Sequence, residues 1–177
     1  MISTAQTNGN YLRTSWKYIL ECLSQFDFLQ LITSGKKEWD LFDKSLLPKN
    51  ENTKNENRDH LSLFESIDNS SIDRIFVNSA HLSWESLLEM IDYMCEISKE
   101  ELKDVKKPRI FCLQKIVEVA DFNMDRIKII WSKLWNKIKD YFSTIGAHPN
   151  TKVSMFVIDS LKQLSIKFLQ VIKPAIF

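Results

Sequence analysis

Apolar residues recur every three or four positions through most of the chain, the spacing that collects side chains on one face of an α-helix. The first such stretch runs from about Tyr11 to Ile32, and Gly35 is a plausible end for it. Residues 48–60 read PKNENTKNENRDH and hold no apolar residue except proline. Because a segment of that composition cannot bury a hydrophobic face, we expect a mobile surface loop at about residues 48–70.

The helical pattern resumes near Ser71 with a short helix, and Ser83 is the expected N-cap of a longer helix after it. Ser98 and Glu101 have the S-x-x-E spacing of a capping box, which predicts another helical segment before Pro108. Proline is common in the first turn of a helix, so Pro108 would open the following one.

Three amphipathic stretches make up the rest of the chain. One runs to Ala120, the second from Asn123 to Ile145, where Gly146 ends it, and the third begins after Asn150 as its cap. Pro174 would stop the last helix. Successive amphipathic helices with short links predict an all-α fold for residues 1–177, with antiparallel hairpins stacked as in HEAT or armadillo solenoids. No strict sequence repeat is present, so a closed helical bundle remains the alternative.

The last helix has two apolar faces. One carries the series that begins with Val153 and Val157, and its polar residues Asp159, Gln163 and Lys167 occupy a narrow wedge beside it. The second face consists of Met155, Ile158, Ile166 and Leu169. Either the next repeat of a longer protein covers this second face, or another part of the chain folds over it. We therefore treat these four residues as candidate protein-binding residues.

Composition supports the all-α prediction and narrows the class of function. Three glycines and four prolines leave few turn-forming residues for a β sandwich or barrel. Twenty-four basic residues nearly balance twenty-three acidic ones, so no nucleic-acid partner is expected. Cys22, Cys95 and Cys112 are odd in number and widely spaced, which favours free core thiols in a reducing compartment. No stretch reaches the ~20 apolar residues that cross a bilayer, and we expect a soluble cytoplasmic protein.

Motifs of catalysis and of cofactor binding are missing from the sequence. It contains no GxxxxGK[ST], GxGxxG, HExxH, CxxC or GxSxG. His60, His81 and His148 stand alone, without a second ligand at helical or turn spacing, and are expected at the surface or near helix ends. We predict no catalytic residue, no cofactor and no metal.

A basic edge is the clearest polar feature. Arg126, Lys133 and Lys137 fall within an arc of about 40° beside the apolar face of their helix and are candidates for protein docking. The plainer alternative is a solvated flank that pairs with local acids such as Asp140. Ile129 points away from the apolar face and is a further candidate contact.

Two expectations concern the core. Asp159 would bond to Arg126 or Lys115 on a neighbouring helix. The tryptophans Trp16, Trp84, Trp131 and Trp135 match core positions of their helices rather than a nucleic-acid stacking platform.

Several segments, taken in order along the chain, match the pattern of one known family. They are Trp16 with 19–25, 29–35, 71–76 with Ser79, PRIFCLQKIVE at 108–118, Asn123-Met124, Arg126-Ile127, GAHPN at 146–150 and DSLKQLSIKFL at 159–169. These segments resemble the large brefeldin-A-sensitive guanine-nucleotide exchange factors for Arf GTPases. The stretch is similar to the first homology domain downstream of the catalytic Sec-seven domain. The exchange motif with its glutamate finger is absent. Asp125 stands where the family pattern has glycine, the loop at 48–60 looks specific to this lineage, and the ending QVIKPAIF lacks the family's continuation into another repeat.

The resemblance implies a non-catalytic, regulatory helical-repeat region of a larger protein. It implies a parent that activates Arf at the trans-Golgi, and a region that is cytoplasmic and peripheral at Golgi membranes. Its implied partners are membrane-bound Arf-GTP, the catalytic domain and neighbouring domains of the same chain, with peripheral membrane contact as a further implication. A purely architectural helical spacer with no partner of its own is the alternative.

Overall fold

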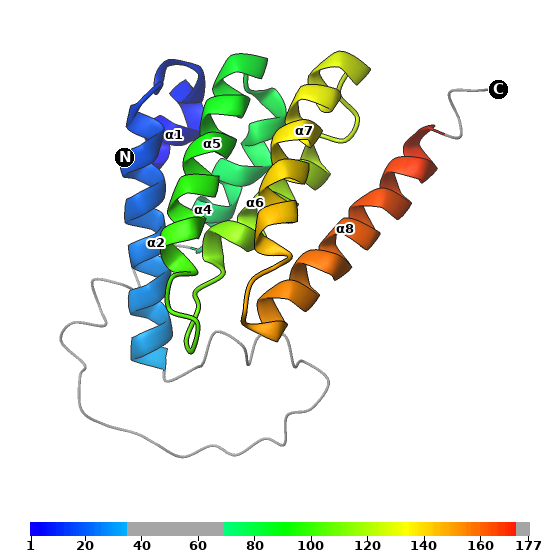
Figure 1. Ribbon diagram of the computed structural model, residues 1–177. Helices are drawn as coiled ribbons and strands as arrows, with labels where there is room; N and C mark the ends of the chain where they lie inside the picture. The colour runs from blue at the N-terminus through cyan, green and yellow to red at the C-terminus, as the bar shows by residue number, and fades with distance from the viewer. Residues whose placement is uncertain (35–68, 173–177) are drawn as a thin grey trace.

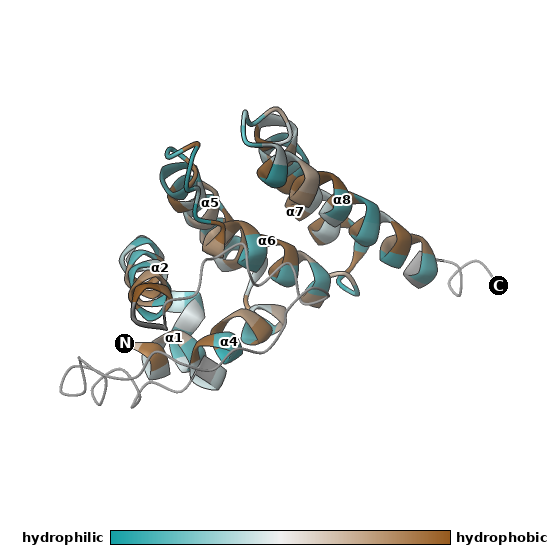
Figure 2. Ribbon diagram, turned by 90° about the horizontal axis from the view of Figure 1, so that it is seen from below, coloured by the Kyte–Doolittle hydropathy of each residue, from teal (hydrophilic) through white to brown (hydrophobic). Residues whose placement is uncertain are grey.

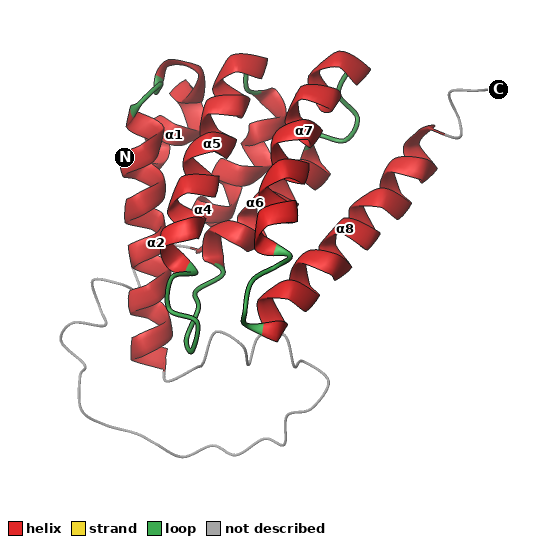
Figure 3. Cartoon of the chain, in the orientation of Figure 1, coloured by secondary structure: helices red, strands yellow, loops and turns green. Residues whose placement is uncertain are grey.

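The computed structural model describes residues 1–34 and 69–172, which form helices and short connections with no strand among them (Figure 3). The elements are α1 (Ile2–Asn8), η1 (Gly9–Tyr11), α2 (Ser15–Ser34), α4 (Asn69–Val77), η3 (Asn78–His81), α5 (Trp84–Glu101), α6 (Phe111–Phe122), α7 (Lys128–Ile145) and α8 (Thr151–Ile172). The all-α prediction is confirmed. The apolar pattern did not indicate α1, because Ala5 is its only buried residue.

The helices form two layers (Figure 2). Helices α2, α5 and α7 lie side by side in one layer, and α4, α6 and α8 form the other. Consecutive helices α5 and α6 run antiparallel, as do α7 and α8, so each pair is a hairpin that crosses both layers (Figure 1). Stacked hairpins, rather than a closed bundle, therefore describe this part of the chain.

The hydrophobic core is one continuous cluster between the layers. Its largest fully buried side chains include Trp16, Phe76 and Phe142, one from each of α2, α4 and α7. The stripes predicted on α4, α5, α6 and α7 supply most of the remaining members, among them Ile75, Leu87, Met90, Ile91, Met94, Leu113, Ile116, Leu134 and Ile138. Burying each such side chain stabilises the fold by about 1.5–3 kcal/mol, so this cluster dominates the folding free energy.

Two predicted caps are confirmed. The Ser83 hydroxyl accepts a 3.2 Å hydrogen bond from the Ser86 amide at the start of α5. Asn150 Oδ1 accepts a 3.0 Å hydrogen bond from the Lys152 amide at the start of α8. In both cases a side-chain oxygen satisfies an amide that the first helical turn leaves without an internal partner.

The capping box predicted at Ser98 and Glu101 is wrong, because both residues lie inside α5. Their helix continues since Ile97 and Leu102 still face the core. The Glu101 carboxylate is also engaged with residues from other elements, so it does not turn back to an N-cap. The extra helical segment before Pro108 is accordingly not formed, and residues 102–110 make a non-helical connection.

Two other helix starts differ from the predictions. Helix α6 begins at Phe111 with Ile110 as its N-cap, so Pro108 precedes its first turn by several residues. Helix α7 begins at Lys128 instead of Asn123. Residues 123–127 form the turn between the two helices, and Ile127 in this turn is 70% exposed.

Ion pairs link the helices within each layer. Helix α5 presents acids on both sides: Lys17 of α2 lies 2.6 Å from Glu96, and Lys137 of α7 lies 2.5 Å from Asp92. In the other layer, Lys115 of α6 pairs with Asp73 of α4 at 2.9 Å, and Lys167 of α8 pairs with Asp121 of α6 at 2.7 Å. Exposed pairs of this kind contribute roughly 0–1 kcal/mol each to the free energy of folding, so their main effect is on how neighbouring helices align along each other.

Three predictions fall wholly or mostly outside the described residues. They are the stop at Gly35, the stop at Pro174 and the surface loop at about 48–70, of which only the last two positions are seen, at the start of α4.

Candidate protein-binding surface

The outer face of α8 is exposed. Met155, Ile158, Ile166 and Leu169 have exposed fractions of 53%, 55%, 47% and 62%. Val153, Val157 and Leu164 on the opposite face are buried in the core. The helix therefore has the two apolar faces expected from its sequence, and none of the described residues covers the second one.

A groove of about 470 Å³ lies between α7 and α8, next to this outer face, and we call it the α7–α8 groove. Its apolar lining comes from Trp131, Trp135, Leu164, Phe168 and Leu169. The Trp131 ring stacks on Phe168 at a centroid distance of 5.5 Å and on Trp135 at 6.0 Å. Lys128, Ser132, Asn136 and Ser165 add polar atoms. Because Leu169 belongs both to the groove and to the outer face of α8, the two form one apolar surface.

The three residues of the predicted basic edge, Arg126, Lys133 and Lys137, each contact different groups. Arg126 precedes α7, and its guanidinium donates hydrogen bonds to the carbonyls of Ser79, Ala80 and Leu82 at 3.0, 2.8 and 2.6 Å. Burial lowers the pKa of the Arg126 guanidinium. This arginine closes the corner between η3 and α5 against the α6–α7 turn, which is a structural task.

The two lysines of that edge both face α5. The Lys133 ammonium lies 4.0 Å from the centroid of the Trp84 ring, and Lys137 pairs with Asp92. Trp84 is 39% exposed beneath this lysine and so is not the core residue that was predicted. The local acid Asp140 instead lies 3.6 Å from Lys139. Ile129 is 70% exposed, as its position on the helix indicated.

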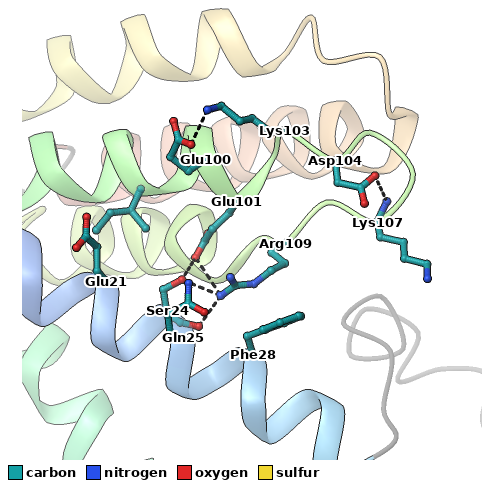
Figure 4. A pocket seen from close by; sticks show the side chains of 11 residues that line it. Glu21, Ser24, Gln25, Phe28, Glu100, Glu101, Lys103, Asp104, Lys107 and Arg109 are labelled. Atoms are coloured by element: carbon teal, nitrogen blue, oxygen red, sulfur yellow. Dashed lines mark hydrogen bonds and ion pairs between the residues drawn. The ribbon is translucent and has the colours of Figure 1, made fainter.

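A second cleft, of about 660 Å³, lies between α2 and the 102–110 connection (Figure 4). At its base the Glu101 carboxylate accepts hydrogen bonds from the Ser24 hydroxyl at 2.6 Å and from the Cys112 amide at 2.9 Å. Arg109 donates to the Ser24 hydroxyl at 2.7 Å, and its guanidinium lies 4.6 Å from the Phe28 ring centroid. These hydrogen bonds connect α2, α5 and α6, and we call the cluster the Glu101 joint.

Burial raises the pKa values of two acids in this part of the structure, Glu101 and Asp27. Desolvation raises the pKa of Glu101, although its hydrogen bonds from Ser24 and Cys112 oppose the shift. Desolvation likewise raises the pKa of Asp27 to about 6, with the nearby Arg109 charge acting against it. Sequence reasoning missed this joint, because its members are 77 and 85 residues apart along the chain. The only available signal was Arg109 within the PRIFCLQKIVE segment.

Other residues of the family-like segments also make long-range structural bonds. Asn123 donates to the Ser79 hydroxyl at 2.9 Å and to the Val119 carbonyl at 2.8 Å. His148 Nε2 lies 3.0 Å from the Leu102 carbonyl, and its Nδ1 accepts from the Asn150 amide at 3.1 Å. His148 is thus part of a helix-end turn, as expected. Asn123 and His148 of these segments therefore hold turns between helices in place.

Two sequence expectations about individual contacts are wrong. Arg126 and Lys115 do not reach Asp159, since Arg126 binds carbonyls and Lys115 pairs with Asp73 and Glu118. Cys22 is exposed rather than a core thiol, because its side of α2 faces away from the other layer. The other two thiols fit the prediction. Cys112 is buried and Cys95 is partly buried, and burial raises the pKa of the Cys95 thiol to about 12.

The described residues contain no group of histidine, cysteine, aspartate or glutamate side chains placed to hold a metal ion. No helix in this part of the chain is both long and apolar enough to pass through a bilayer.

The stacked hairpins define a helical module with an exposed apolar surface along α7 and α8. Comparison with known proteins finds relatives that align with almost the whole chain. The chain is 37% identical over 197 aligned residues to brefeldin A-inhibited guanine nucleotide-exchange protein 1 of Homo sapiens, and 30% identical over 213 residues to the protein of the same name from Arabidopsis thaliana. Each alignment covers 96% of the chain. The chain is therefore homologous to one region of the brefeldin A-inhibited guanine nucleotide-exchange proteins, as the resemblance indicated.

The chain spans only about a tenth of the length of these relatives, 10% of the human protein and 13% of the Arabidopsis protein. No protein-family model matches it.

Proposed function

We propose that this chain is a non-catalytic, regulatory helical-repeat region of an Arf guanine-nucleotide exchange factor that works in vesicle traffic at Golgi membranes. It corresponds to the first homology domain downstream of the Sec-seven catalytic domain. Its partners are an Arf-family GTPase in the GTP form and neighbouring domains of the parent chain, including the catalytic one, with peripheral contact to the membrane. No nucleic acid and no cofactor take part.

One observation carries the proposal. Almost the whole chain, 96% of it, aligns with about a tenth of a large exchange protein. In this chain the outer face of α8 is exposed and apolar. Contiguous apolar surface at one edge of a helical stack marks a place where another protein element docks. The polar groups around Arg126 and Glu101, in contrast, bond to other elements of the same chain and connect its helices.

The direct test is a titration of this chain with Arf loaded with GTP or GDP on liposomes, with bare liposomes as the control. We expect tighter binding to Arf-GTP. Replacing Met155 and Ile158 by glutamate should weaken that binding, whereas replacing the exposed Tyr11 and Tyr18 by glutamate should leave it unchanged. Equal affinity for the two nucleotide forms would overturn the proposed partner.

The second candidate function is a purely architectural spacer, which the ion pairs and hydrogen bonds between successive hairpins favour. For a spacer, surface substitutions would change stability or assembly of the parent protein without changing the affinity for any partner. A third possibility is that this chain is itself a catalyst of nucleotide exchange, which a measurement of nucleotide release from Arf tests. We expect this chain alone to leave the release rate unchanged, and acceleration would contradict a non-catalytic role.

A further inference from the structure

The α7–α8 groove has the shape of a receptor for large side chains. Trp131 forms its floor and is only 4% exposed, while Trp135 and Phe168 stand partly exposed beside it. The volume of about 470 Å³ lies within the range of sites that enclose sizeable apolar groups. Such a recessed aromatic floor favours inserted side chains over contact with a flat surface.

The surroundings of the groove are basic. Residues 128–172, which form α7, α8 and their connection, contain seven lysines and two aspartates, a net charge of +5 in a chain whose total is +1. The ion pairs of Lys137 with Asp92 and of Lys167 with Asp121 reduce this charge to +3. Lys128 lines the groove, and no acidic side chain does. Lys139 lies one helical turn from the lining residue Trp135 on α7, and Lys162 lies about one turn from the lining residue Ser165 on α8. Lysines therefore flank the apolar lining on both helices.

We propose that the α7–α8 groove binds an acidic amphipathic helix of a partner protein. Large apolar side chains of that helix insert against Trp131, Trp135 and Phe168, and carboxylates beside its apolar stripe meet Lys128 and Lys162. An amphipathic helix in an apolar groove is a recurrent mode of recognition, in which buried apolar anchors supply most of the affinity and charges on the rim select the partner.

Two other occupants fit less well. A second copy of this chain would bring together two hairpins that each keep a net charge of +3 after their ion pairs with Asp92 and Asp121, and like charges oppose such an interface. An anionic membrane would be attracted by the lysines, but a bilayer surface cannot reach the recessed Trp131 ring. The inference rests on the proposed function only in treating this chain as a module that binds other proteins.

The probe is a synthetic 18-residue amphipathic helix with a leucine stripe flanked by glutamates, and its twin has lysines in place of the glutamates. Binding is followed by fluorescence anisotropy of the labelled peptides. We expect the acidic peptide to bind with a Kd on the order of 10 μM, its twin at least about tenfold more weakly, and the preference to shrink with added salt. Equal affinity of the two peptides would overturn the proposal.

Two pairs of variants locate the site. The double variant Lys128→Glu with Lys162→Glu should bind the acidic peptide at least about tenfold more weakly. The control Lys106→Glu with Lys107→Glu makes the same charge change in the 102–110 connection and should leave the peptide affinity unchanged. Ser132→Trp fills the groove from an exposed position and should abolish binding, and Ser143→Trp, exposed outside it, should not. Circular dichroism of each variant confirms folding.

The remaining outcomes are decisive as well. Undiminished peptide binding by a folded Ser132→Trp variant would show that the peptide binds elsewhere and would overturn the proposal that it binds in the α7–α8 groove. A dimer in sedimentation that Ser132→Trp disrupts, or binding to anionic vesicles in the absence of any peptide binding, would replace the proposed occupant by a second copy or by a membrane. Loss of peptide binding alone leaves the Arf-GTP titration standing, and failure of that titration alone leaves the groove standing, so the two proposals fail separately.

Discussion

The Ser24 hydroxyl donates a 2.6 Å hydrogen bond to the Glu101 carboxylate, which joins the middle of α2 to the last residue of α5. The other oxygen of the same carboxylate accepts from the Cys112 amide at the start of α6. A single side chain thus connects three helices, and it does so while buried, at 7% exposure. Removing it leaves several buried polar groups without partners.

We expect Glu101→Ala to lower the free energy of unfolding by about 3 kcal/mol, because a buried charge partner and two acceptors are lost together. Glu101→Gln keeps one acceptor and most of the volume, so about half that loss is expected. Urea unfolding at pH 7 measures both. Glu100→Ala at the exposed neighbouring position is the control, and an equal effect there would contradict the role given to Glu101.

Asp27 makes the fold sensitive to pH. Because burial raises the pKa of Asp27 to about 6 in the folded state, its favourable contribution is complete below the unfolded pKa near 3.8 and is lost as the pH rises through 6. Asp27→Asn should therefore stabilise the protein by about 1 kcal/mol at pH 7, a value discounted for partial exposure, and the gain should vanish near pH 4. Thermal unfolding of both proteins across pH 4–7 measures this difference. A gain that is constant over that range would disprove the pKa assignment.

Arg126 should matter for stability despite its lysine-rich neighbourhood. Arg126→Ala leaves the carbonyls of Ser79, Ala80 and Leu82 without their donor and should cost about 2–3 kcal/mol. Arg126→Lys should recover part of the loss, since an ammonium reaches fewer of the three acceptors. Chemical denaturation measures the series, and Lys103→Ala in an exposed ion pair should change stability by less than about 0.5 kcal/mol.

The two faces of α8 should respond differently to truncation. Leu164→Ala removes a side chain that is 2% exposed and should cost about 2–4 kcal/mol, whereas Ile166→Ala at 47% exposure should cost less than about 0.5 kcal/mol. Denaturant midpoints of the two variants test this contrast directly. A large loss at Ile166 would show that the outer face is covered in solution.

Cys22 should react with a thiol reagent much faster than Cys95 and Cys112 do. Cys22 is exposed, while Cys112 is buried and burial raises the pKa of Cys95 to about 12. Because the thiolate is the reactive form, a disulfide reagent at neutral pH should modify one thiol quickly and the other two only as the protein unfolds. Mass spectrometry identifies the modified residue, and Cys22→Ser should remove the fast phase.

Much of the fold follows from local patterns in the sequence. The spacing of apolar residues fixed the helical class and the core faces of α4, α5, α6 and α7, because helical periodicity is a property of neighbouring residues. Ser83 and Asn150 marked two helix starts for the same reason, since a cap acts within its own first turn. The second apolar face of α8 was also readable from its sequence alone.

Only the tertiary structure decided where the polar side chains go. Ser98 and Glu101 have the spacing of a cap, yet both lie in the last turn of α5, and a serine 77 residues away binds the Glu101 carboxylate. The sequence places Arg126 within the arc of Lys133 and Lys137, yet in the structure it precedes their helix and bonds to carbonyls 44 to 47 residues earlier. The α7–α8 groove likewise exists only once two helices are packed side by side. Local periodicity determines which face of a helix is buried, but long-range packing determines which partners its polar and exposed groups meet.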